Sequence, residues 1–123
     1  MGVSVKVTSK RPKMGVIGCG GISRAHFRVA EELQKKGLLE LVAVCDIVEA
    51  KAREKGEMYK IPYFTDTEKI LRMDMDFVDI CTGDYTHHVI AKLAAEHGKH
   101  MLIEKPMAIT LPCCDVIINA CRK

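Results

Sequence analysis

Runs of four to seven mostly apolar residues alternate along the chain with longer segments in which apolar residues recur at helical spacing. Short runs rich in β-branched residues are typical of strands buried on both faces of a parallel sheet, whereas the longer segments have the period of amphipathic helices. Five strands are predicted, over residues 13–17, 39–45, 62–65, 77–81 and 100–103. Five helices are predicted, over residues 22–36, 49–59, 66–72 and 84–97, and from residue 110 to the C-terminus.

Capping signals set the ends of several of these helices. Gly37 follows two lysines and predicts the left-handed residue that closes the first helix. Thr65 and Glu68 have capping-box spacing, so a short helix is expected behind them. Asp84 is expected to cap the fourth helix, and Thr110 is expected to begin the last one.

Helical spacing also predicts which side chains face the sheet. On the first helix these are Ile22, Ala25, His26, Val29, Ala30 and Leu33, and on the fourth Val89, Ile90, Leu93 and Ala94. His26 is interpreted as a packed histidine rather than a catalyst, because a histidine on an inner helix face is more often structural.

Strands that alternate with helices at short spacing predict a parallel sheet with right-handed crossovers. The expected fold is a doubly wound, Rossmann-type α/β fold of three layers with strand order 3-2-1-4-5, over residues 13–123. Residues 1–12, with apolar Val3, Val5 and Val7, are predicted to form an arm or a short edge strand. Ligands of such sheets bind beyond the C-terminal strand ends, at the switch point between the first and fourth strands.

Composition limits the function classes. The 123 residues suffice for one domain with its own core, and 48% hydrophobic and 28% charged residues are typical of globular proteins. No apolar run approaches the roughly 18 residues of a membrane span, and residues 1–13 lack a signal-peptide pattern, so a cytoplasmic protein is expected. A net charge of +3 without a basic stripe argues against nucleic acid as a partner. The six cysteines include no C-x-x-C pair, so reduced thiols and no metal site are predicted.

The segment from Gly18 to Ser23 joins the first strand directly to the first helix. Gly18 and Gly20 give the backbone the freedom for a tight turn and for close approach to a bulky anion. Gly21 and Ile22 complete the turn, and the N–H groups of the helix N-terminus favour a pyrophosphate there. Ser23 is a small substitute for the third glycine of G-x-G-x-x-G, so the pattern predicts a dinucleotide site rather than an ordinary glycine turn.

Asp46 ends the second strand, 26 residues after Gly20, which is near the about 20 residues expected for the acid that binds an adenosine ribose. A carboxylate accepts hydrogen bonds from the 2′-hydroxyl of NAD and repels the 2′-phosphate of NADP. Ile47 offers no arginine for that phosphate, so NAD is the predicted cofactor and NADP is less favoured. Lys51 and Arg53 lie close enough to keep the preference moderate.

Other polar residues follow the fourth and fifth strands and are expected at the same edge of the sheet. These predicted cofactor-binding residues are Thr82, Gly83 and Asp84 after the fourth strand, and Glu104, Lys105 and Pro106 after the fifth. Judged on the residues alone, a solvated pair in a loop whose turn Pro106 fixes is the favoured interpretation of Glu104 and Lys105.

Three segments resemble the glucose–fructose oxidoreductase/inositol dehydrogenase (Gfo/Idh/MocA) family. Residues 98–108, which contain Glu104-Lys105-Pro106, are similar to the family's Glu-Lys-Pro segment. Residues 16–26 are similar to its opening, and residues 41–46 to its second strand. The resemblance covers nearly the whole chain and implies the nicotinamide-dinucleotide-binding domain of an oxidoreductase.

The resemblance also implies roles for single residues. Lys105 matches the family's lysine near the nicotinamide, which takes part in proton transfer to a substrate hydroxyl, and desolvation beside a bound cofactor would favour its neutral form. His87 matches the family's histidine on the nicotinamide side, so it is a predicted catalytic and cofactor-binding residue, whereas His88 is expected at the surface. The chain departs from the family's Thr-Pro-Asn at Thr82-Gly83-Asp84.

Family members continue into a second α/β domain that supplies the substrate pocket, and this chain is expected to lack it. The predicted function is hydride transfer between NAD(P) and a CH–OH group of a sugar, cyclitol or nucleotide sugar, with substrate bound only alongside such a domain. The alternatives are a non-catalytic dinucleotide-binding or sensing module and a purely structural assembly partner. An exposed fifth strand predicts a homo-oligomer.

Overall fold

The computed structural model describes residues 11–123, so the predicted strand or arm over Val3, Val5 and Val7 lies outside the described residues. Five parallel strands form one sheet in the order β3-β2-β1-β4-β5, as predicted. Their bounds are β1 Lys13–Ile17, β2 Glu40–Cys45, β3 Tyr63–Phe64, β4 Phe77–Ile80 and β5 His100–Ile103. β2, β3 and β4 are one or two residues shorter than predicted, while β1 and β5 have the predicted bounds.

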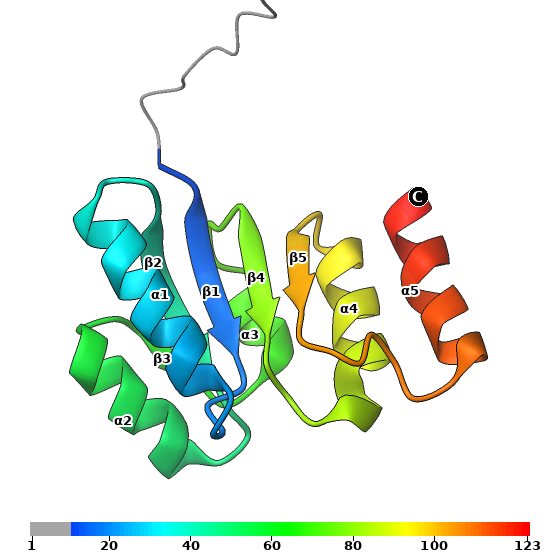
Figure 1. Cartoon of the computed structure of the whole chain (residues 1–123), viewed down its shortest axis with the longest axis horizontal. Helices are drawn as coiled ribbons and strands as arrows, with labels where there is room; N and C mark the ends of the chain where they lie inside the picture. Colours follow the sequence, from blue (N-terminus) through cyan, green and yellow to red (C-terminus); the bar gives the residue numbers. More distant parts are fainter. Residues whose placement is uncertain (1–10) are drawn as a thin grey trace, which may run out of the picture.

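Helices cover both faces of the sheet, which gives three layers (Figure 1). Helices α1 (Ser23–Lys35) and α2 (Glu49–Tyr59) lie on one side, and α3 (Thr67–Leu71), α4 (His87–Glu96) and α5 (Leu111–Arg122) on the other. A short 3-10 helix, η1 (Asp84–Thr86), precedes α4. Helix α5 packs on α4 at the side of the sheet, and Ile117 is its one buried residue.

Alternate strand residues supply two separate cores, because successive side chains of a strand point to opposite faces. Val16 and Val44 pack under α1 with Phe27 and Ala30. On the other face, Ile17 and Ile80 belong to the larger cluster. That cluster draws from α3, α4 and α5 the residues Ile70, Leu71, Ile90, Ala91, Ala94 and Ile117. The central strands β1, β2 and β4 are therefore buried on both faces, which explains their apolar runs, whereas no residue of the edge strands β3 and β5 is fully buried.

The prediction of which α1 residues face the sheet is wrong in part. Ser23, Phe27 and Ala30 are its buried residues, whereas Val29 is 53% exposed and Ile22, just before the helix, is 50% exposed. Ala25 is also exposed, and on α4 the prediction for Val89 is wrong. The physical reason on α1 is that the aromatic ring of Phe27 fills the space over the sheet, so the second apolar stripe of the helix turns toward solvent.

Two of the four predicted helix caps are present, and two differ. Gly37 is left-handed (φ 75°), and the Thr110 hydroxyl accepts from the Cys113 N–H at 3.2 Å. Asp66, rather than Thr65, caps α3 by accepting from Glu68 N–H. Asp84 does not cap α4, because it is the first residue of η1 and no side-chain cap is present at either helix. Within the described residues, no helix has the length and apolar character needed to cross a membrane.

Candidate functional site

The turn after β1 brings the backbone of three strand ends together. Gly18 N–H donates to the Cys45 carbonyl at 2.8 Å, and Cys81 N–H donates to the Ile17 carbonyl at 2.8 Å. Gly18 has φ +107°, and a Cβ there would lie 2.6 to 2.8 Å from backbone atoms of Cys81 and Thr82. Only glycine fits this position, because both the dihedral angle and the close approach of β4 exclude a side chain.

Gly20 differs from Gly18, because a Cβ at Gly20 would meet no atom within 4 Å. The fold itself does not require glycine here, which leaves open space above the turn for a ligand. Ser23 is fully buried, and its hydroxyl donates to the Gly20 carbonyl at 2.5 Å. The serine thus serves the close-packed role predicted for it and adds a bond that closes the turn.

Asp46 connects the end of β2 to this turn. One carboxylate oxygen accepts from the Cys19 N–H at 2.8 Å, and the other accepts from the Val48 N–H at 2.8 Å. The side chain is therefore held at the switch point by two backbone donors. Its remaining lone pairs are available for hydroxyl donors of a ligand.

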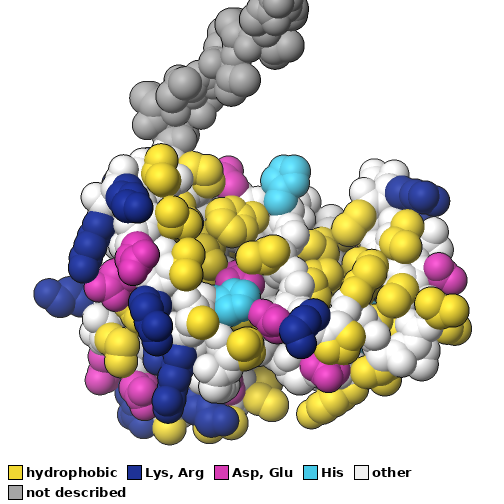
Figure 2. Space-filling model, viewed as in Figure 1, with side chains coloured by type: hydrophobic (Ala, Val, Ile, Leu, Met, Phe, Trp, Pro, Cys, Tyr) yellow, Lys and Arg dark blue, Asp and Glu magenta, His cyan; other side chains and the backbone are white. Residues whose placement is uncertain are grey.

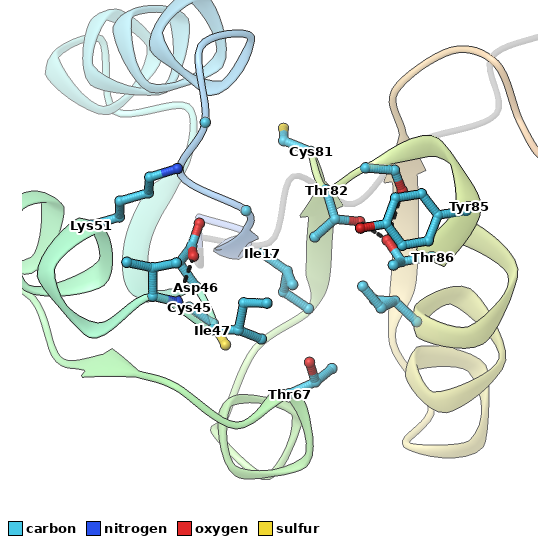
Figure 3. A pocket seen from close by; sticks show the side chains of 15 residues that line it. Ile17, Cys45, Asp46, Ile47, Lys51, Thr67, Cys81, Thr82, Tyr85 and Thr86 are labelled. Atoms are coloured by element: carbon cyan, nitrogen blue, oxygen red, sulfur yellow. Dashed lines mark hydrogen bonds between the residues drawn. The ribbon is translucent and has the colours of Figure 1, made fainter.

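A cleft of about 290 Å³ opens between the ends of β1, β2 and β4. Figure 3 shows Asp46 and Lys51 on one side of it and Thr82, Tyr85 and Thr86 on the other. The predicted residues that line it are Gly18, Gly20, Asp46, Ile47, Thr82 and Gly83. Ile47 is 85% exposed and offers an apolar surface beside Asp46. The cleft thus combines open apolar walls with a few fixed polar groups, as small-molecule sites do.

A second hollow of about 270 Å³ lies on the other side of the turn. Cys19, Gly20 and Gly21 form its floor, and Arg24, Lys51, Glu54 and Lys55 stand around it. Gly21, a predicted cofactor-binding residue, therefore belongs to this hollow rather than to the cleft. Arg24, Lys51 and Lys55 outnumber Glu54, so the hollow beside the helix N-terminus carries a net positive charge that favours an anion.

Beyond Thr82 and Gly83, the other predicted residues after β4 and β5 do not line the cleft. Asp84 is exposed and away from it, while Glu104, Lys105 and Pro106 follow β5 at the adjacent strand end. Lys105 is exposed. The Lys105–Pro106 peptide bond is cis.

His87 is fully buried, contrary to the expectation that it faces a nicotinamide. Its Nδ1 lies 2.8 Å from the Pro106 carbonyl oxygen and its Nε2 lies 3.1 Å from that of Thr82. The ring therefore links the two loops behind the strand ends instead of reaching the cleft. His88 is half-buried rather than at the surface, and its Nδ1 has no hydrogen-bond partner among the described residues.

His26 lies between two carboxylates that sequence reasoning did not connect with it. Its Nδ1 is 2.6 Å from Asp79 Oδ2, and its Nε2 is 2.6 Å from Glu104 Oε2. Burial disfavours the charged ring, but the bonds to both acids outweigh this and raise the pKa of His26 above its ordinary 6.5. Burial raises the pKa of Asp79, and the bond to His26 lowers that of Glu104.

Among the described residues, His26, Asp79 and Cys81 also bring possible metal-ligating atoms within 4.8 Å of one another. Both ring nitrogens of His26 already lie against carboxylates, so an ion triad of His26, Asp79 and Glu104 accounts for the arrangement. The thiols nearby are unreactive, because burial raises the pKa of Cys19 and of Cys45 to about 12 and raises that of Cys81 further. The absence of a metal stays a prediction.

Sequence reasoning also missed Thr67, Tyr85 and Thr86 as residues of the cleft. Thr86 Oγ1 lies 2.7 Å from both Thr82 Oγ1 and the Gly83 carbonyl, which orders the loop after β4. Asp79 carried a signal that could have been used. It is an acid in the centre of an otherwise apolar strand, and such a residue needs a buried partner.

Comparison with known proteins agrees with this arrangement. Residues 12–123 match the family described as an oxidoreductase family with an NAD-binding Rossmann fold. D-apiose dehydrogenase of Paraburkholderia graminis is 33% identical over 118 residues, which are 94% of this chain and 31% of that protein. Inositol 2-dehydrogenase of Salmonella typhimurium is 31% identical over 114 residues, 90% of this chain and 33% of that protein.

Among solved structures, the WlbA dehydrogenase of Chromobacterium violaceum, in complex with NADH and UDP-GlcNAcA, superposes with a TM-score of 0.88 and 26% identity. The match covers 94% of this chain and 33% of that one. The chain thus spans about a third of the length of the relatives it matches. It belongs to the Gfo/Idh/MocA oxidoreductase family and has that family's NAD-binding Rossmann fold.

Proposed function

We propose that this chain binds NAD across the turn at Gly18–Gly20 and the cleft beyond it, as the cofactor half of a sugar, cyclitol or nucleotide-sugar dehydrogenase. The observation that carries the proposal is the open space at Gly20 beside a fixed Asp46, at the switch point of the sheet. The substrate class is supported by the relatives, which are named as dehydrogenases of apiose and inositol or contain a nucleotide sugar.

The residues divide the work of binding. The turn residues Gly20 and Gly21 border the positive hollow and would hold the pyrophosphate. Asp46 would accept hydrogen bonds from the adenosine ribose, with Ile47 against the base. We infer a preference for NAD over NADP, because the Asp46 carboxylate opposes a 2′-phosphate, and Lys51 beside it keeps the preference moderate.

Lys105 is the proposed proton-transfer residue of the longer protein. It follows β5 at the edge where the ligands of such sheets bind, and its exposed ammonium is free to face a substrate. His87 is proposed to hold this loop through the Pro106 carbonyl rather than to exchange protons itself. The bound nicotinamide would supply the hydride chemistry.

The test of the proposal is NADH binding, measured by titration calorimetry on wild type and on Gly20→Val. A branched side chain at residue 20 would fill the space that the pyrophosphate needs, while its Cβ would meet no atom of the fold within 4 Å. We expect Gly20→Val to abolish binding while leaving thermal unfolding nearly unchanged. Glu32→Val, which adds a valine to the exposed face of α1, is the matched control.

Unchanged affinity in Gly20→Val would show that the turn is only a turn. Failure of the wild type to bind NADH or NADPH would remove the dinucleotide proposal altogether. Loss of binding in Glu32→Val as well would show that helix destabilisation, not steric exclusion, explains the effect.

A further inference from the structure

The ion triad of His26, Asp79 and Glu104 joins three elements that are distant in sequence. His26 comes from α1, Asp79 from the centre of β4, and Glu104 from the residue after β5. The Asp79 side chain is 1% exposed, and those of His26 and Glu104 are about one-fifth exposed. The triad lies on the side of the sheet that α1 covers, next to β4 and β5, where no helix lies over the strands (Figure 1).

The geometry fits a charged ring, whose pKa the two acids raise. A neutral imidazole has one N–H, so it could donate to one carboxylate and would turn a lone pair toward the other. With a carboxylate oxygen 2.6 Å from each nitrogen, a doubly protonated ring donates to both acids in two charge-assisted hydrogen bonds. Two further groups lie beside the carboxylates: the Cys81 thiol, 3.5 Å from Asp79 Oδ1, and Lys105, whose charge acts on Glu104. Neither supplies a replacement proton donor on the ring's axis.

The turn at residues 104–106 is held at both ends by histidines. His26 binds the Glu104 side chain, and His87 Nδ1 lies 2.8 Å from the Pro106 carbonyl. The backbone of Lys105 also stabilises the Glu104 carboxylate. Lys105 therefore stands between two fixed points, one on α1 and one on α4.

We propose that His26 is a positioning residue whose doubly protonated ring fixes the turn 104–106 against β4 and thereby sets the affinity for the nicotinamide cofactor. This inference rests on the proposed function for its effect on cofactor, whereas the effect on the turn does not depend on it. Loss of the ring proton frees one carboxylate, and the repulsion between a ring lone pair and that carboxylate moves the turn away.

NMR on the full 123-residue chain tests the first part. The ring of His26 and the backbone amides of Lys105 and Met107 are followed from about pH 6 to about pH 9, a range that starts near the ordinary histidine pKa and extends upward because the pKa of His26 is raised. We expect both amides to shift with the midpoint of the His26 ring. Glu104→Gln, which removes one carboxylate, should lower that midpoint.

NADH titration over the same pH range tests the second part. In wild type the affinity should fall as pH rises through the pKa of His26. In His26→Gln it should be weaker by about tenfold at neutral pH, as expected for lost charge-assisted hydrogen bonds, and independent of pH. His100→Gln, on an exposed histidine of β5, is the matched control and should bind as wild type does.

Amides of Lys105 and Met107 that ignore the His26 titration would overturn the proposal, and so would equal affinities and pH profiles in wild type and His26→Gln. If wild type binds no NADH, the proposed function fails, and the amide shifts still decide whether His26 holds the turn. If His26→Gln does not fold, the wild-type pH series and Glu104→Gln carry the decision, since neither requires that variant.

Discussion

Gly18 and Gly20, in the turn after β1, differ in what an added Cβ atom would contact. A Cβ at Gly18 would collide with the backbone of β4, so that glycine belongs to the fold. A Cβ at Gly20 would meet nothing, so that glycine has no structural reason to be there. A residue whose smallness the fold does not need is best explained by something outside the chain, and here that is the proposed pyrophosphate.

Asp46 has a structural role as a hydrogen-bond acceptor and a proposed role in cofactor binding, so its substitution is expected to have two effects. We expect Asp46→Ser to raise the ratio of NADP affinity to NAD affinity at least several-fold, because the change removes the repulsion of a 2′-phosphate. The two backbone donors at Cys19 and Val48 also lose their acceptor, so absolute affinity for both cofactors should fall. Paired titrations with NAD and NADP separate the two effects. A wild type that already prefers NADP would contradict the assignment.

Among the secondary structure elements, the strands were predictable and the orientation of α1 was not. β1 is buried and is read as a continuous apolar run, and the half-exposed edge strand β5 is also a short apolar run, so both have their predicted bounds. Helix α1 carries two apolar stripes, and spacing alone does not say which one Phe27 will bury. The choice depends on the shape of the sheet beneath, which is not a local property of the sequence.

The candidate site, too, was predictable from the sequence only in part. Glycines, Asp46 and the polar residues after β4 follow from strand ends and topology, so sequence placed them at one edge. The partners of His26 are 53 and 78 residues away, and nothing local links them. His87 was assigned by resemblance to a cofactor-facing role, while its burial depends on how the loops after β4 and β5 pack.

Thr110 tests whether a predicted cap contributes to stability. Its hydroxyl accepts from the Cys113 N–H at the start of α5, a helix that packs mainly on α4. Thr110→Ala should lower the free energy of unfolding by about 1 kcal/mol, the usual effect of losing such a cap, whereas Thr110→Ser should retain most of it. Urea unfolding followed by circular dichroism measures both. Equal midpoints for all three proteins would mean that the end of α5 is not part of the cooperative unit.

At the scale of the whole molecule, one side of the sheet is left with apolar groups in solvent. Strand β5 pairs with β4 on one side only, and Leu102 on it is 53% exposed. Figure 2 shows apolar side chains gathered between α1 and α5 on this face. The exposed apolar residues of these two helices include Val29 on α1 and Ile118 on α5. An apolar edge of this kind favours association with another chain.

We therefore expect the 123-residue chain to form dimers at high concentration through β5 or α5. Leu102→Lys should shift the equilibrium toward monomer, because a charged residue on an edge strand opposes pairing. Leu38→Lys, at an equally exposed leucine after α1, should leave the equilibrium unchanged. Sedimentation equilibrium measures the dissociation constant. A strict monomer at high concentration would contradict the prediction.

The last prediction concerns turnover. The chain spans about a third of the length of its relatives, so binding of NADH without dehydrogenation of inositols or sugars is expected. A chimera that adds the remaining two thirds of the Salmonella inositol dehydrogenase should gain activity. In that chimera Lys105→Ala should lower kcat by about 10²- to 10⁴-fold with little change in NAD affinity, as expected for a positioned acid–base group.

Steady-state kinetics and NADH titration measure the two quantities, kcat and NAD affinity, separately. Robust activity from the 123 residues alone would contradict the division of labour, and full activity of Lys105→Ala would remove the lysine from the mechanism. An inactive chimera that still binds NADH would favour the sensing alternative, because the cofactor site would then operate without chemistry.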